Sequence, residues 1–137
     1  MSINSWKKEF YKGRVKEAGR TAASALNHSA LKWNGLTQAN LRRHGLFYHY
    51  VYGVTNPDTE SQLAVDVDTC ALCVYDELQS TLSGNGRRGC SHCPLTQLNK
   101  SFKCSNSHSP FSYWADTGNP ARMIKAIAQC KELLHIR

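Results

Sequence analysis

The residues with the clearest chemistry in this chain are two cysteine pairs. Cys70 and Cys73 form one Cys-x-x-Cys pair, and Cys90 and Cys93 form a second pair after a spacer of sixteen residues. Two such pairs about 15–20 residues apart are typical of a structural zinc site. A two-residue spacer lets both sulfurs of a pair face one ion, and the second pair completes a tetrahedron. The spacing therefore predicts one structural Zn²⁺ held by four thiolates.

Other donors near these pairs leave the ligand set open. Cys104 follows the second pair and is able to replace either of its cysteines, and His108 is a further substitute. His92 lies between the two cysteines of the second pair and points away if both bind. We favour the four paired cysteines as ligands, with Cys104 in reserve. Cys130 lies on the apolar side of a predicted C-terminal helix and is most simply a core residue.

The same pattern argues against several kinds of catalysis. Catalytic zinc keeps an open position for water, which a closed set of four thiolates does not provide. Thiol–disulfide exchange is the other chemistry of a Cys-x-x-Cys pair, but a single pair is enough for it. The chain contains neither a Gly-x-Ser-x-Gly motif nor a Walker loop. The sequence therefore indicates no particular reaction.

Helices and strands that position the cysteines can be read from the periodicity of the chain. Residues 15–34 have small and apolar side chains at helical spacing, with Gly19 as a weak point and Gly35 as the end. Thr37 is a suitable cap for a short second helix that Gly45 closes. Residues 71–82 predict a helix that leaves the first cysteine pair.

Between these helices the sequence predicts a β-hairpin. Residues 47–54 are rich in aromatic and β-branched side chains, which favours a strand. Asn56-Pro57-Asp58 supplies a turn, and residues 62–68 alternate apolar with polar side chains. This second strand would deliver the chain to Cys70.

The end of the chain predicts one more helix. Asn119 is a suitable cap and Pro120 a suitable residue for the first turn. An apolar stripe follows at Met123, Ile124, Ile127, Ala128 and Leu134. We therefore predict an α+β fold, a small helical domain with a β-hairpin and a four-cysteine zinc knot, in which the C-terminal helix packs on the core.

We expect a single domain over residues 1–137, with charge distributed unevenly along it. Residues 1–46 form a basic helical segment, residues 47–104 the hairpin and zinc knot, and residues 105–137 a loop and the C-terminal helix. Residues 1–45 hold nine Lys or Arg and two acids, whereas residues 46–99 hold two Arg and six acids. Such a basic segment is either an ordinary solvated face or a surface for a polyanion.

The polyanion interpretation names a set of candidate partner-binding residues and two classes of partner, nucleic acid or an acidic protein. The set is Lys7, Lys8, Lys12, Arg14, Arg42, Arg43, Arg87 and Arg88. Arg87 and Arg88 also have an electrostatic explanation, because four thiolates around one divalent ion leave a charge of about −2 that nearby cations offset.

Two further expectations concern the compartment and the assembly of the chain. The first ten residues contain no long apolar run, and no stretch approaches the length of a membrane span. We therefore expect a cytoplasmic chain in which cysteines are metal ligands or free thiols. We expect a monomer or a homodimer, the latter through the apolar strip of residues 47–52.

One resemblance covers much of the chain. It is carried by His28-Ser-x-x-Lys32-Trp33-x-Gly35-Leu36, Asn40-Leu41-x-x-His44-Gly45-Leu46, Cys-x-Leu-Cys, Cys-x-x-Cys-Pro-Leu, Cys104 and Ser109-Pro110-Phe111. This pattern resembles small zinc-knot accessory proteins of tailed bacteriophages, which have no assigned activity. The resemblance implies a phage accessory protein in the cytoplasm of an infected bacterium, and it adds weight to Cys104 as a ligand or packing partner.

A second resemblance is confined to the cysteines. The block Gly86-Arg-Arg-Gly-Cys90-Ser-His-Cys93, after the first pair, is similar to the zinc frame of phage His-Asn-His recombination endonucleases. Those enzymes place a His-Asp-His-type run between the pairs, where it binds the catalytic metal. Residues 74–89 contain no histidine.

Two functions of different classes follow. The first is a non-catalytic, zinc-stabilised phage accessory protein that binds a host protein or nucleic acid, with inhibition of a host enzyme or defence system as one form of that role. The alternative is a metal-dependent, His-Asn-His-like nuclease whose residues lie outside the expected loop, at His44, His49 and His108.

Overall fold

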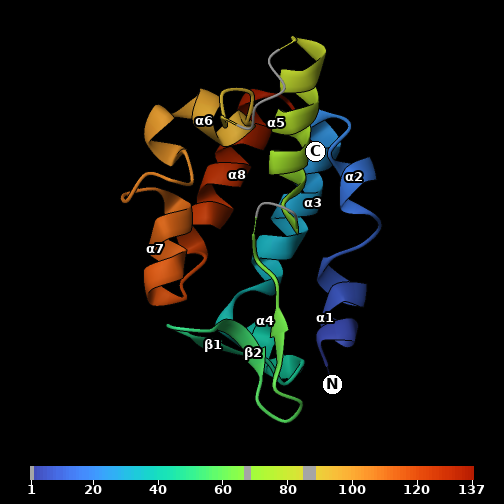
Figure 1. Ribbon diagram of the computed structural model, residues 1–137, viewed down its shortest axis with the longest axis vertical. Coiled ribbons are helices and arrows are strands. Elements are labelled where there is room, and N and C mark those ends of the chain that lie inside the picture. The colour runs from blue at the N-terminus through green and yellow to red at the C-terminus, as the bar shows by residue number, and fades with distance from the viewer. Residues whose placement is uncertain (1, 67–68, 85–88) are drawn as a thin grey trace.

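The computed structural model describes residues 2–66, 69–84 and 89–137, and it confirms the α+β class (Figure 1). Three short strands form one antiparallel sheet, and the helices pack beside and above it. The helices are α1 (Ile3–Phe10), α2 (Val15–Ala18), α3 (Ala22–Gly35), α4 (Gln38–Arg43), α5 (Ala71–Leu82), α6 (Pro94–Leu98), the 3₁₀ helix η2 (Lys100–Phe102), α7 (Pro110–Thr117) and α8 (Ala121–Leu133). The strands are β1 (Phe47–His49), β2 (Gly53–Asn56) and β3 (Ser61–Leu63).

The helix α3 is the centre of the fold, packed against α1, α5 and α8. The predicted helix over residues 15–34 is divided into α2 and α3, because Thr21 caps a new helix by accepting a hydrogen bond from the Ser24 N–H. At the other end of α3, the Trp6 indole N–H donates to the Gly35 carbonyl over 2.8 Å. A β-carbon at Gly35 would overlap the Phe10 ring, so glycine allows α1 to approach closely.

The sheet has three strands where the sequence predicted a two-stranded hairpin. The predicted strand over residues 47–54 turns at residues 50–52, and its two halves become β1 and β2. The predicted turn at Asn56-Pro57-Asp58 is present, with the Asn56 side-chain oxygen accepting from the Asp58 N–H. Val54 pairs with Leu63, and both side chains are buried in the core.

The two helices that the sequence predicted most clearly are both present. The helix α5 has the predicted bounds, and α8 begins after Asn119, whose side-chain oxygen accepts from the Ala121 N–H. The buried residues of α8 are Met123, Ala126, Ile127 and Cys130, so the helix packs on the core as expected. The predicted apolar stripe was wrong at two positions, since Ala128 and Leu134 are exposed.

An aromatic cluster joins the sheet to the C-terminal helices. The Trp33 and Trp114 rings meet edge to face at 5.2 Å, and the Tyr48 and Phe111 rings pack on Trp114. The helix α7 holds Trp114 in place, with Ser109 as its cap and Gly118 in the left-handed region at its end. Among the described residues, no helix combines the length and the apolar character needed to cross a membrane.

Candidate metal centre

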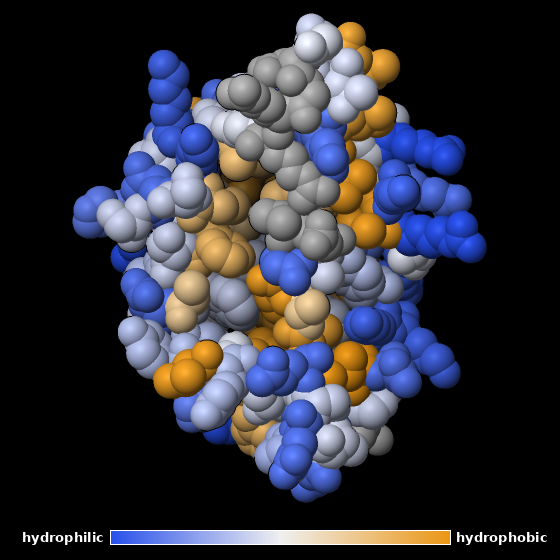
Figure 2. All heavy atoms as spheres, in the orientation of Figure 1, coloured by the Kyte–Doolittle hydropathy of each residue, from blue (hydrophilic) through white to orange (hydrophobic). Residues whose placement is uncertain are grey.

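Five of the six cysteines line one cavity in the upper part of the molecule. The cavity has a volume of about 290 Å³, and its cysteines are Cys70, Cys73, Cys90, Cys93 and Cys104. In Figure 2, residues of apolar hydropathy gather around a hollow in the face shown, and hydrophilic residues lie farther out toward the edges. The structure therefore brings together the four favoured ligands and the reserve ligand. We call this site the cysteine cavity.

Two of these cysteines stand at the beginnings of helices. Cys70 directly precedes α5, and the backbone N–H groups of Leu72 and Cys73 act on its sulfur to lower its pKa. Cys93 directly precedes α6 in the same way. The positive end of a helix dipole and its free N–H groups stabilise a thiolate at such a position. Local chain geometry thus prepares one sulfur of each pair for a metal.

The second pair is held in place by a carboxylate on α5. Asp76 is 2% exposed, and its two oxygens accept from the Cys90 N–H at 3.1 Å and the His92 N–H at 2.8 Å. Cys90 adopts a left-handed backbone with φ of 62°, which is uncommon outside glycine. Asp76 therefore fixes the strained loop of the second pair to the helix that begins at the first pair.

His92, between the two cysteines of the second pair, makes its contacts outside the cysteine cavity. The His92 ring hydrogen-bonds to the hydroxyls of Ser80 and Ser91, and it is not among the residues that line the cysteine cavity. His108 lies in the loop before α7, where its N–H donates to the Asn106 side chain. The structure brings sulfur, rather than imidazole, to the cavity.

The cavity thiols shift one another's pKa values. The side-chain hydrogen bond with Cys73 holds the pKa of Cys70 below its usual value, and the same bond raises the pKa of Cys73. Burial raises the pKa of Cys93 and of Cys104 to about 12. The pKa is thus lowered at Cys70 and raised at the other cysteines of the cavity. A divalent soft metal is the group that deprotonates such a set, because it replaces the thiol protons.

A lysine that the sequence did not single out shares the cavity. Lys32 lies on α3, is 2% exposed and lines the cavity beside the cysteines. Its positive charge lowers the pKa of Cys70 and of Cys104. The ion pairs of the described residues join Glu9 to Arg43 and to His44, and none involves Lys32. Since a buried ammonium is stable only beside negative charge, Lys32 fits a cavity that holds thiolates.

The donor set fits a zinc ion, although the sulfurs line the cavity wall rather than one ready coordination sphere. Among the described residues, no three His, Cys, Asp or Glu side chains already stand as a formed metal-binding group. Soft thiolates on two Cys-x-x-Cys turns are the ligands that zinc prefers. The choice between Cys104 and a cysteine of the second pair stays open, because all five sulfurs line the same space.

The candidate partner-binding residues occupy a different part of the molecule. Lys7 and Lys8 on α1, Lys12 and Arg14 in the following segment, and Arg42 and Arg43 on α4 are all exposed. Arg43 donates to the Glu9 carboxylate over 2.5 Å, which ties α4 to α1. Arg87 and Arg88 lie outside the described residues. The remaining cations thus come from two neighbouring helices and the segment that follows the first.

The three histidines of the alternative nuclease lie in different parts of the fold. His44 is buried and its ring nitrogens hydrogen-bond to Ser5 and Glu9. His49 accepts a hydrogen bond from the N–H of Val51 at the β1–β2 turn. These contacts place His44 against α1, His49 at the edge of the sheet, and His108 in the loop before α7.

Comparison of the chain with protein-family models, with curated proteins and with solved structures finds no match. The fold and the site define the chain as an α+β protein with a cysteine-lined cavity. Its function must therefore be argued from its own residues.

Proposed function

We propose that this chain is a non-catalytic binding protein, stabilised by one structural zinc ion in the cysteine cavity, that uses its basic surface to bind a polyanionic partner. The observation that carries the proposal is the meeting of five thiols with the buried ammonium of Lys32 in one cavity. That arrangement suits a charged metal–thiolate centre and provides a rigid scaffold.

The cysteines would hold zinc as a closed structural site. Cys70, Cys73, Cys90 and Cys93 are the first choice of ligands, and Cys104 is the fifth sulfur available. Four thiolates and one Zn²⁺ leave a charge of about −2, and the Lys32 ammonium offsets part of it. Such a centre supplies folding energy and has no open position for water, so it favours a scaffold over an enzyme.

The basic surface supports a partner that carries negative charge. Only Arg43 among its described cations is paired with a carboxylate within the described ranges. Those cations are all exposed, and they are Lys7, Lys8, Lys12, Arg14, Arg42 and Arg43. Nucleic acid and an acidic face of a host protein both fit this surface. The resemblance to phage accessory proteins favours a partner in the infected cell, where occlusion of a host enzyme or defence component would inhibit it.

A charge-removal experiment tests the proposed surface. Lys7, Lys8, Lys12 and Arg14 changed together to Ala should leave zinc content and melting temperature unchanged, because these side chains are exposed. Binding to labelled nucleic acid, or to a host protein recovered with the wild type, should weaken and lose much of its salt dependence.

The matched control removes the same number of charges elsewhere. Lys100, Lys125, Lys131 and Arg137 lie in the C-terminal part of the chain, and their change to Ala should leave partner binding near that of the wild type. Equal losses from both variants would show a general effect of net charge. Unchanged binding in the N-terminal variant would overturn the proposed surface.

A further inference from the structure

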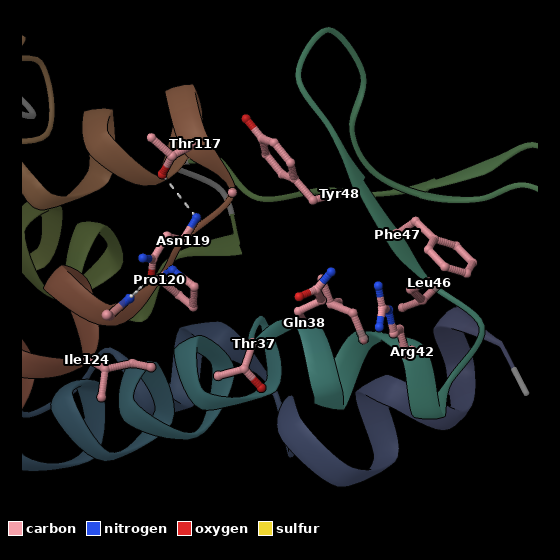
Figure 3. Close-up of a pocket in the computed structure, with 13 residues that line it drawn as sticks. Thr37, Gln38, Arg42, Leu46, Phe47, Tyr48, Thr117, Asn119, Pro120 and Ile124 are labelled. Carbon is pink, nitrogen blue, oxygen red and sulfur yellow. Dashed lines mark hydrogen bonds between the residues drawn. The ribbon is translucent and has the colours of Figure 1, made fainter.

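A second hollow lies between α4, β1 and the connection from α7 to α8 (Figure 3). Its volume is about 500 Å³, within the range of pockets that hold organic ligands. Gln38 and Arg42 form one wall, Tyr48 lies on another and the segment around Asn119 forms the third, while the Phe47 ring points away from Tyr48 at the rim. No aspartate or glutamate is among the described residues that line it. We call this site the Arg42 cleft.

The two adjacent arginines of α4 have different surroundings. The Arg43 guanidinium is held by Glu9 and by the side-chain oxygen of Asn40. Arg42 lines the cleft, and within the described ranges no ion pair involves it. Its five N–H donors are suited to a phosphate. The cleft therefore presents a cation whose charge is not neutralised by a described carboxylate.

Aromatic side chains continue from the cleft along the β1–β2 hairpin. Phe47 is 47% exposed, and Tyr50 and Tyr52 at the turn are 71% and 61% exposed. The turn is ordered by its own contacts, since the His49 ring accepts from the Val51 N–H and lies 5.0 Å from the Tyr52 ring. Three exposed rings thus occupy six successive residues, and Phe47, the first of them, lies at the rim of the cleft.

The wall that carries these rings is fixed to the core. The Tyr48 hydroxyl donates to the Ala115 carbonyl, and the Tyr48 ring packs edge to face on Trp114. A β-carbon at Gly118 would overlap the Tyr48 ring, so the ring lies directly on the backbone of the α7–α8 connection. The strand β1 is therefore anchored to the C-terminal helices beside the cleft, which limits the order that binding must gain there.

We infer that the Arg42 cleft and the hairpin bind single-stranded nucleic acid, with a phosphate on Arg42 and bases stacked on Phe47, Tyr50 and Tyr52. This inference rests on the proposed function and names its partner class. Exposed rings beside a cation are the elements of sequence-tolerant single-strand binding. A duplex hides the faces of its bases, so the row of aromatic residues favours a single strand.

Fluorescence anisotropy with the full-length, zinc-loaded chain tests the inference. The probe is a labelled oligo-dT of about 12 nucleotides, the length range of single-strand sites. Tyr50→Ala with Tyr52→Ala should weaken binding roughly fivefold or more, the lower end of the effect of losing stacking on one base. Arg42→Ala should weaken binding and lower the slope of log K against log salt by about 0.7.

Two controls define the outcomes. Lys16→Ala removes one exposed charge on α2 and should leave affinity within about twofold of the wild type. Arg43→Ala should have a smaller effect than Arg42→Ala, because Glu9 already neutralises Arg43. Melting temperatures of all variants should match, which separates binding from folding.

The results distinguish failure of this inference from failure of the proposed function. Oligo-dT binding that survives the Arg42 and tyrosine changes but falls in the Lys7, Lys8, Lys12 and Arg14 variant would overturn the inference and keep the basic surface. Preference for a duplex, or for an acidic protein with no nucleic-acid binding, would likewise overturn only the inference. Loss of every polyanion partner at low salt would overturn both.

Discussion

The cysteine cavity and the Arg42 cleft each contain one basic side chain beside aromatic rings, yet their settings are opposite. Lys32 is buried among thiols, with its nitrogen 5.3 Å from the centre of the Trp33 ring. Arg42 is exposed in a cleft without acidic lining residues among those described. A buried cation must find its counter-charge inside the protein, whereas an exposed one is able to take it from a partner. If both proposals hold, burial separates Lys32, which would serve the fold, from Arg42, which would serve binding.

The largest effect should come from removing a metal ligand. Cys70→Ser or Cys93→Ser should abolish zinc binding and unfold the second half of the chain, because structural zinc contributes roughly 10–16 kcal/mol, comparable with the whole stability of a domain. Circular dichroism and zinc analysis measure this. Cys130→Ser is the control, with a loss of about 1 kcal/mol, since Cys130 lies in the core away from the cavity lining.

The second-largest loss of stability should come from changing Asp76. Asp76→Ala leaves the N–H groups of Cys90 and His92 without their acceptor, and a hydrogen bond to a charged group contributes about 1.5–3 kcal/mol. We expect a loss of about 3 kcal/mol in urea unfolding together with weaker zinc binding. Glu132→Gln, at an exposed position of α8, should change stability by less than about 0.5 kcal/mol. Equal stability of the two variants would contradict the anchoring role.

Changing Lys32 tests most sharply whether the buried cation balances the charge of a metal–thiolate centre. Lys32→Met should lower zinc affinity by about 10–100-fold, the usual effect of losing a group that supports the metal ligands. In the metal-free chain the same change should be neutral or stabilising, because it removes a buried charge. Competition with a zinc chelator measures the first effect and denaturant unfolding the second. A Lys32→Met chain with wild-type zinc affinity would show that the ammonium does not balance the centre.

His28 should give a smaller, pH-dependent effect. Burial, assisted by the charge of Lys32, lowers the pKa of His28, and within the described ranges neither ring nitrogen has a hydrogen-bond partner. The folded state therefore binds fewer protons than the unfolded state, so stability falls as pH drops below about 6.5. The slope contributed by one such group is at most about 1.4 kcal/mol per pH unit.

His28→Gln should flatten this part of the stability curve, measured by urea unfolding from neutral pH downward. His135→Gln, on an exposed terminal residue, should leave the curve unchanged. A His28→Gln curve with the wild-type slope would assign the acid sensitivity to the thiolates alone.

The smallest effect on stability should come from the hairpin. Tyr50→Ser and Tyr52→Ser should change the free energy of unfolding by less than about 0.5 kcal/mol each, because both side chains are mostly exposed. A thermal melt checks this. A loss comparable with that of Asp76→Ala would mean that these rings belong to the fold and would weaken their assignment to a partner.

Local signals in the sequence were enough to predict the parts that depend on neighbouring residues. The helix over residues 71–82 and the start of α8 follow from periodicity and capping, and both are present. The spacing of the cysteine pairs predicted a shared site, and the structure places all four around one cavity. Cys104 lines the same cavity, and its role as a zinc ligand stays a prediction.

Contacts between distant residues could not be predicted in this way. Asp76 binds an N–H sixteen residues later, and the Tyr48 hydroxyl reaches a carbonyl sixty-seven residues away. Trp33 lies on the apolar face predicted for residues 15–34, and Lys32 directly precedes it. A lysine at that position in the sequence fits a solvated side chain as well as a buried one. His28, four residues before Lys32 on α3, is buried as well. Burial of a polar side chain is decided by packing partners from elsewhere in the chain.

Native mass spectrometry of the untagged protein, purified gently from a bacterial lysate, tests the central claim most directly. The account predicts one zinc ion per chain, lost on chelation together with the compact charge-state distribution of a folded domain. A metal-free chain that stays folded, lighter by two hydrogens for each disulfide, would contradict the zinc centre and assign the cysteines to thiol chemistry.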